Sequence, residues 1–209
     1  VNNSKRGNDL TGKEWLQNSF SIWRDLSKSA EEKKMQHPAS YPVALCEKLI
    51  KTFSRDGSNI LDPFNGTGSS MVAALNLGST GTGIDLSDVF CEIANTRVGD
   101  NDNITILNGD SNELLDTLED NSFDLCITSP PYWDILNQQR SADKKVSINY
   151  SDKDEDLGNI DDYELFLKRL GLLFGKVYKK IKPGGYCIIN VMDLRKKSTF
   201  YPLHMDLVL

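Results

Sequence analysis

Blocks of apolar and polar residues follow one another along this chain of 209 residues, and the blocks differ in length. Short apolar runs bounded by turn residues predict buried strands, whereas longer stretches with apolar residues at helical spacing predict helices. The predicted strands are residues 60–62, 81–85, 104–107, 125–128 and 186–191. The predicted helices are 69–77, 89–97, 113–118 and 163–181, with two more starting near Pro42 and at Pro202.

This alternation of strand and helix predicts an α/β fold with a mostly parallel sheet and helices on both faces. Right-handed crossovers bring the carboxyl ends of parallel strands to one edge, where open α/β sheets bind ligands. Polar residues follow the predicted strands at that edge. They are Asp62, Asp85, Asp110, Ser129 and Asp193.

Two segments lie outside this pattern. Residues 1–36 form a polar arm with three isolated aromatic anchors, Trp15, Phe20 and Trp23, so we expect the catalytic domain to be residues 37–209. Residues 134–160 are polar and too long for a simple connector, which indicates a functional loop or lid.

The last apolar segment begins a helix, and we expect further chain or a second subunit, as in a homodimer, to cover the sheet edge left beside it.

The composition excludes several classes of protein. The chain has neither a signal peptide nor an apolar run long enough for a membrane span, so we expect it in the cytoplasm. Four scattered cysteines predict buried thiols rather than disulfides or zinc ligands. A net charge of −6 disfavours a surface that is basic all over, so any contact with nucleic acid must be local.

The sequence Ser129-Pro130-Pro131-Tyr132, at the end of a predicted strand, is the most informative motif. Two adjacent prolines cannot continue a central strand, because neither has an N–H group to donate. The chain must therefore leave the sheet at a rigid corner. This corner offers a hydroxyl, a free carbonyl and an aromatic ring to a flat ligand that carries an amino group.

A second motif, a glycine turn, runs from Asp62 to Ser70 and includes Gly66 and Gly68. Glycines let the backbone approach a ligand, and the helix that follows offers free N–H groups. The turn lacks the spacing of a dinucleotide site and the lysine of a phosphate loop, so a nucleoside with a carboxylate tail fits it better. An ordinary loop is the alternative. Asp85 is suited to the two ribose hydroxyls, because Ser87 or Asp88 is the better cap for the next helix.

Together these residues resemble a known family. Asp-Pro-Phe-x-Gly-Thr-Gly-Ser followed by Thr-Ser-Pro-Pro-Tyr-Trp is similar to the S-adenosylmethionine-dependent DNA methyltransferases that modify exocyclic amino groups, including those of restriction–modification systems. The form with Ser129 is most similar to the cytosine-N4 branch, since the adenine-N6 branch more often has Asp there. The resemblance extends from about His37 onward and implies a Rossmann-like, class I methyltransferase fold, incomplete here at its carboxyl end.

The resemblance also implies roles for individual residues. Asp110 would meet the adenine amino group, although Asp110 and Ser111 also compete to cap the next helix. His37 would lie beside the cofactor carboxylate, unless it is a capping or packing histidine. The predicted site for S-adenosylmethionine comprises Asp62, Pro63, Phe64, Gly66, Thr67, Gly68, Asp85, Leu86, Asp110, Ser111 and His37.

The implied reaction is methylation of a base that has been flipped out of DNA. Ser129 and the Pro130 carbonyl would accept the two N–H groups of the target amine, Pro131 would hold the corner rigid, and Tyr132 would stack on the base. The predicted DNA contacts are Trp133, Arg140, Arg195, Lys196 and Lys197, with Lys144 and Lys145 in the long loop. A solvated turn is the alternative for residues 195–197.

Four functions remain open. These are a cytosine-N4 DNA methyltransferase, an adenine-N6 DNA methyltransferase, an RNA or protein amino-methyltransferase, and a nucleotide-binding module without activity.

Overall fold

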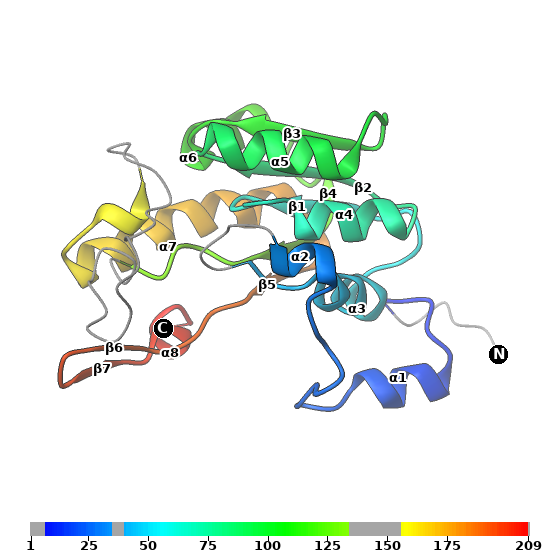
Figure 1. Ribbon diagram of the computed structural model, residues 1–209, viewed down its shortest axis with the longest axis horizontal. Helices are drawn as coiled ribbons and strands as arrows, with labels where there is room; N and C mark the ends of the chain where they lie inside the picture. The colour runs from blue at the N-terminus through cyan, green and yellow to red at the C-terminus, as the bar shows by residue number, and fades with distance from the viewer. Residues whose placement is uncertain (1–6, 35–39, 134–155, 209) are drawn as a thin grey trace.

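The fold was determined as a computed structural model, which describes residues 7–34, 40–133 and 156–208. Its centre is a sheet of five parallel strands in the order β3-β2-β1-β4-β5 (Figure 1). The strands are β1 (Asn59–Asp62), β2 (Thr80–Asp85), β3 (Ile104–Asn108), β4 (Phe123–Thr128) and β5 (Ile181–Ile189). The strand order reverses between β1 and β4, so a crevice opens at the carboxyl ends of these two neighbours.

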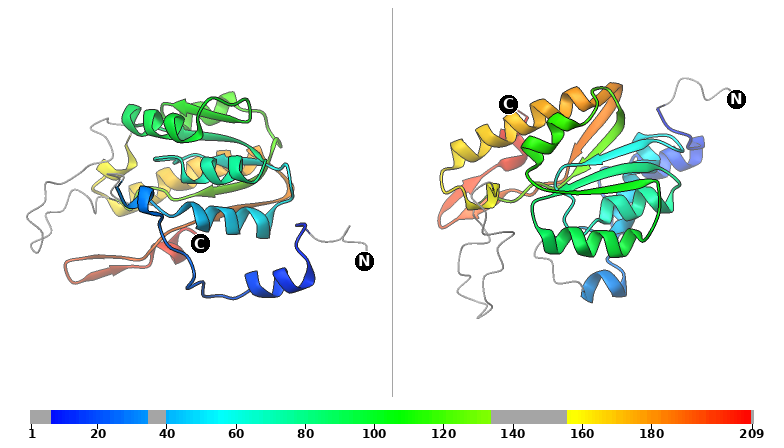
Figure 2. Two further views of the ribbon diagram at one scale, coloured as in Figure 1. Left: turned by 45° about the vertical axis from the view of Figure 1, so that its right-hand side comes forward. Right: turned by 90° about the horizontal axis from the view of Figure 1, so that it is seen from above.

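Helices cover both faces of the sheet, as Figure 2 shows from above. On one face lie α3 (Val43–Phe53), α4 (Ser69–Asn76) and α5 (Asp88–Val98). On the other lie α6 (Ser111–Leu114), the 3₁₀ turn η1 (Leu115–Thr117) and α7 (Tyr163–Lys180). Each face buries its own apolar cluster, and this two-sided burial explains why the central strands β1 and β4 read as apolar runs.

The fifth strand begins earlier than the sequence predicted. We expected Pro183-Gly184-Gly185 to separate a helix from a strand at 186–191, but β5 starts directly after α7, at Ile181. The pairing of β5 with β4 is irregular between Phe123 and Leu125, and this irregularity accommodates the proline and the glycines within the strand.

The N-terminal arm contains two short helices that the sequence reading missed, α1 (Gly12–Asn18) and α2 (Ala30–Lys34). The arm packs on the domain, because the Asn8 side chain donates to the Thr52 carbonyl at 2.7 Å and Trp23 joins the cluster under α3. Trp15 and Phe20 are 40% and 63% exposed, so the prediction that they act as anchors was wrong.

A β-hairpin follows the sheet and was also missed. It consists of β6 (Leu194–Lys196) and β7 (Thr199–Tyr201), and it projects from the body beside α7 (Figures 1 and 2). A short helix, α8 (Leu203–Asp206), follows it where the sequence predicted a helix. Just before α7 lies the 3₁₀ turn η3 (Leu157–Asn159).

Three of the four cysteines are buried free thiols, as predicted, but Cys187 is exposed on β5. None of the described helices combines the length and the apolar character that crossing a bilayer would require.

Candidate active site

Asp62, at the end of β1, is the buried centre of the site. Its side chain is 0% exposed and accepts four hydrogen bonds, two on each oxygen. The donors are the N–H of Phe64 and the hydroxyls of Tyr41, Ser70 and Thr128, with distances of 2.7 Å from Thr128 and 2.9 Å from Tyr41. Burial raises the pKa of this carboxyl above its usual value, while the hydroxyl donors oppose the shift. Asp62 therefore joins the glycine turn to the end of β4.

The glycine turn lies against β2 and α5 at van der Waals distance. The Asn65 side chain packs on Gly83, where an added Cβ would lie 2.5 Å from it. Gly68 has a φ of +82° and lies so close to Ala94 that a Cβ would be 2.9 Å away. Gly68 is the N-cap residue of α4 and offers no side-chain cap, so no side chain of the cap satisfies the first N–H groups of α4.

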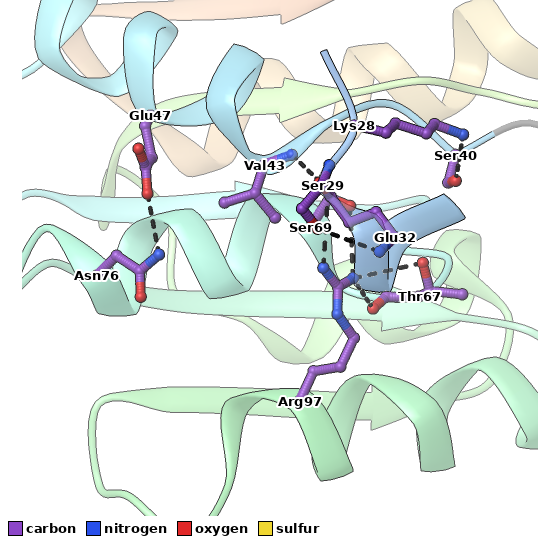
Figure 3. A network of polar contacts seen from close by, with 10 residues as sticks. All are labelled: Lys28, Ser29, Glu32, Ser40, Val43, Glu47, Thr67, Ser69, Asn76 and Arg97. Atoms are coloured by element: carbon purple, nitrogen blue, oxygen red, sulfur yellow. Dashed lines mark hydrogen bonds and ion pairs between the residues drawn. The ribbon is translucent and has the colours of Figure 1, made fainter. Parts of the chain in front are cut away.

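An arginine holds the turn from behind (Figure 3). Arg97, in the last turn of α5, donates to the Thr67 carbonyl at 2.6 Å and approaches the Ser69 hydroxyl at 3.4 Å. The buried carboxylate of Glu32 lies 3.9 Å from Arg97 and accepts the N–H of Val43 at 2.7 Å. Burial alone would raise the pKa of Glu32, but the backbone donors outweigh it and hold the pKa low. The N-terminal arm is thus linked to the glycine turn through one ion pair.

A cavity of about 360 Å³ lies at the carboxyl edge of the sheet, within the range of about 300–1,000 Å³ typical of small-molecule sites. Of the predicted site residues, seven cofactor residues and two corner residues line it. They are Phe64, Gly66, Thr67, Asp85, Leu86, Asp110, Ser111, Ser129 and Pro131. The remaining predicted cofactor residues in the described part do not line it. These are Asp62, Pro63 and Gly68, which build the turn from beneath.

Asp85, at the end of β2, presents its carboxylate to this cavity. One oxygen accepts the N–H of Gly66 at 2.7 Å and the other accepts the N–H of Ser87 at 2.9 Å. Burial raises the pKa of Asp85 to about 6, although these two donors lower it. Ser87 caps α5, as predicted, so the second lone pair on each Asp85 oxygen remains available to a ligand with two hydroxyls.

Asp110 and Ser111 divide the two roles for which they competed. Asp110 is the cap of α6 and accepts the N–H of Asn112 at 2.8 Å. The Ser111 hydroxyl donates instead to the Pro63 carbonyl, which ties α6 to the glycine turn. If Asp110 binds the cofactor, its carboxylate must do so while it also accepts the capping hydrogen bond from Asn112.

The corner after β4 has the rigid geometry that its prolines predicted. The Ser129 hydroxyl donates to the Asn190 carbonyl at 2.8 Å. The Tyr132 hydroxyl lies 3.2 Å from the Oγ atom of Ser129. Because the Ser129 proton is committed to Asn190, the Tyr132 hydroxyl is the donor in the second contact and one lone pair of Ser129 stays free. Among the described residues no donor reaches the Pro130 carbonyl. Pro130 and Tyr132 do not line the cavity, so the acceptor that the corner presents there is the free lone pair of Ser129.

The predicted DNA contacts lie in different surroundings. Trp133 is 3% exposed and packs between Tyr163 and Tyr201, so in this structure its ring is not available to DNA. Lys196 covers that ring, with Nζ 4.0 Å from its centroid. Arg195 and Lys197 are exposed on the hairpin. His37, Arg140, Lys144 and Lys145 lie outside the described residues. Asp193 pairs with His204 at 2.5 Å and does not line the cavity.

The parallel strand order, the glycine turn after β1 and the acid after β2 define a Rossmann-like methyltransferase fold of class I. A family model for a methyltransferase domain matches residues 61–144, and it supports S-adenosylmethionine as the cofactor. A second family model, described as DNA methylase, matches residues 2–96. The resemblance to the S-adenosylmethionine-dependent DNA amino-methyltransferases is therefore confirmed.

Curated relatives carry the same resemblance, and the matched part of the chain spans about a third of their length. Over 84 residues the chain is 39% identical to the orphan methyltransferase M.BamHII of Bacillus amyloliquefaciens, covering 38% of this chain and 31% of that protein. Over 78 residues it is 36% identical to the type II methyltransferase M2.DpnII of Streptococcus pneumoniae, covering 37% and 29%. A crystal structure of an S-adenosylmethionine-dependent methyltransferase from Mesorhizobium loti aligns with 64% of this chain and 45% of its own, at 24% identity and a TM-score of 0.40.

The sequence did not predict the contacts of three residues that organise the site, namely Glu32, Arg97 and Tyr41, although Tyr41 belongs to the segment around His37 that the resemblance placed beside the cofactor. Ser29-x-x-Glu32 is a capping-box pattern, in which Glu32 accepts the N–H of Ser29 at 2.7 Å, and this pattern could have located α2. Tyr41 and Arg97 carry no such signal, since their partners are distant in sequence.

Proposed function

We propose that this chain transfers a methyl group from S-adenosylmethionine to the exocyclic amine of a base in DNA, with cytosine N4 as the preferred target. The observation that carries the proposal is the hydrogen bond from Thr128 to Asp62, at 2.7 Å. It fixes the Ser129 corner beside the glycine turn, and Ser129 lines the same cavity as Gly66 and Asp85. A nucleophile held at the corner would thus face a cofactor held at the turn.

The cavity residues fit the cofactor. The Asp85 carboxylate can accept the two ribose hydroxyls, the side chain of Phe64 offers an apolar wall, and the uncapped start of α4 suits a carboxylate. When bound, the cofactor supplies a methyl group on a sulfonium, which is a good leaving group. Alignment can then supply much of the catalysis, and a strong general base is not required.

The corner activates the amine by accepting its protons. An exocyclic amine on a base is a weak nucleophile, because its lone pair is delocalised into the ring. The free lone pair of Ser129 Oγ and the Pro130 carbonyl would accept the two N–H groups and favour a pyramidal nitrogen, whose lone pair can then attack. Tyr132 orients Ser129 through its hydroxyl and would stack on the base. The methylated nitrogen finally releases one proton to solvent.

Local positive charge is the proposed route to DNA phosphates. Arg195 and Lys197 are exposed on the hairpin, and Lys196 lies over Trp133. By contrast, Lys180 and Lys182 near the opposite edge are paired with Asp120 and Asp124 at 2.6 and 2.8 Å. The hairpin cluster therefore suits phosphates better than the lysines at the end of α7.

The experiment follows labelled methyl groups from S-adenosylmethionine into unmethylated DNA, RNA and protein, with mass spectrometry of the nucleosides. N4-methylcytosine is the expected product. Detection of N6-methyladenine instead would make adenine N6 the target. Label in RNA or protein alone would contradict DNA as the substrate. Absence of transfer to any of them, with cofactor still bound, would indicate a binding module.

Ser129→Ala is the matching variant. It should lower turnover about tenfold or more, since one hydrogen bond to the amine is lost, while cofactor affinity stays constant. Ser122→Ala, just before β4 at its other end, is the control. Loss of cofactor binding without loss of turnover per bound cofactor would contradict the role of Ser129.

A further inference from the structure

The β6–β7 hairpin has two faces of different character. Its strands pair Leu194 with Tyr201, Arg195 with Phe200, and Lys196 with Thr199. Since side chains alternate along a strand, Arg195 and Phe200 share one face and the other four residues share the opposite face.

The inner face anchors the hairpin to the active site. Leu194 is 1% exposed, and the Tyr201 ring lies 4.9 Å from Trp133 and 4.7 Å from Tyr163, measured between centroids. Lys196 Nζ lies over the Trp133 ring as well. Trp133 directly follows the Ser129–Tyr132 corner, so these contacts fix the hairpin relative to the site of reaction.

The outer face pairs a cation with an aromatic ring in solvent. Phe200 is 54% exposed, and Arg195 opposite it is exposed too. No described ring stacks on Phe200 and no described carboxylate pairs with Arg195. Lys197 is exposed at the turn, with a φ of +56°.

The combination narrows the class of partner. An acidic peptide would match the two cations but gives no reason for an exposed ring, and an apolar protein surface would bury the cations without partners. A DNA duplex offers both phosphates and the faces of stacked bases. Phenylalanine is one of the side chains that proteins insert between base steps.

We propose that the outer face of the β6–β7 hairpin binds duplex DNA beside the target, with Arg195 and Lys197 on phosphates and Phe200 in the space that the flipped base leaves. This inference rests on the proposed function and adds how the base is kept out of the stack. Unstacking a base costs free energy, and a ring that fills the gap offsets part of this cost.

The test compares two short duplexes of one mixed sequence, of which one contains a single abasic site that mimics the gap. Binding to the 209-residue chain is measured by fluorescence anisotropy in the presence of S-adenosylhomocysteine. The unaltered protein should prefer the abasic duplex by about tenfold, the scale of one base–aromatic stack. Phe200→Ala should abolish this preference, and Phe200→Tyr should keep it.

Two further variants separate stacking from charge. Arg195→Gln should weaken binding to both duplexes equally and reduce the slope of log affinity against log salt by about one. Phe20→Ala removes a ring that is 63% exposed on the N-terminal arm and should change nothing.

Cofactor affinity and methyl transfer are measured on the same proteins. The inference would be overturned if Phe200→Ala kept the preference for the abasic duplex. It would also be overturned if the unaltered protein methylated DNA without showing that preference. Either result would leave the proposed function standing. A protein that neither binds nor methylates DNA would overturn both.

Discussion

Asp85 should make cofactor binding depend on pH in a range where few other carboxyls titrate. Burial raises its pKa to about 6, and only the ionised carboxylate can accept both ribose hydroxyls in addition to the N–H groups of Gly66 and Ser87. With that pKa, about 90% of the side chain is ionised at pH 7 and about 10% at pH 5. Affinity for S-adenosylmethionine should therefore fall about tenfold, or ~1.4 kcal/mol, between these values.

The sign follows from the direction of the shift. A carboxyl whose pKa is raised in the folded state holds its proton more tightly there, so in the cofactor-free protein its contribution to the free energy of unfolding falls as pH rises from about 4 to about 6. The shift of about two units corresponds to at most ~3 kcal/mol. Cofactor binding opposes this loss, because the ribose hydroxyls favour the ionised form.

Isothermal titration calorimetry between pH 5 and pH 8 measures the effect. Asp85→Asn, which cannot ionise, should bind at least tenfold more weakly at pH 7 and show a flat profile. Equal pH dependence in the two proteins would refute the assignment of Asp85 to the ribose, even if Asp85→Asn binds less tightly.

Three other substitutions, with Gly171→Ala as a control, test the residues that support the site. Asp62→Ala leaves two buried and two part-buried donors without an acceptor and should lower the free energy of unfolding in urea by about 4 kcal/mol or more; a loss below about 1 kcal/mol would contradict the central role of Asp62. Arg97→Gln should weaken cofactor binding about fivefold, because the carbonyl of the glycine turn loses a charged donor, with unchanged affinity as the contrary result. Gly83→Ala should lower the melting temperature, since its Cβ would lie 2.5 Å from Asn65, whereas Gly171→Ala in α7, with no neighbour within 4 Å, should raise it.

The centre of the sheet could be predicted from the sequence, because burial on both faces leaves β1 and β4 as clear apolar runs. Ile60 and Leu61 of β1 and Leu125 and Ile127 of β4 are all at most 1% exposed. The same pattern places Asp62, Asp85 and Ser129 at strand ends, so topology alone brings them to one edge. The core of the site was therefore readable before the structure.

The hairpin and the links to the arm could not be predicted, for two different reasons. The β6–β7 turn has Lys197 in the left-handed conformation, where a glycine or asparagine would have given a turn signal. Trp133 looked like a surface ring because its burial depends on Tyr163 and Tyr201, which are distant in sequence. Arg97 carried no signal in the sequence, since its acceptor, the Thr67 carbonyl, is a backbone atom of a distant turn.

The pairing of β1 with β4 has a consequence for the order of the chain. The cofactor turn and the corner are joined by two register pairs, Ile60 with Leu125 and Leu61 with Cys126, and by Thr128 and Asp62, which are 66 residues apart. None of these contacts depends on which half comes first along the polypeptide. A gene rearrangement that exchanged the two halves would therefore rebuild the same site. Two separately encoded polypeptides, divided before β4, should likewise reassemble and bind the cofactor, and a pair that associates without binding would show that the connection itself matters.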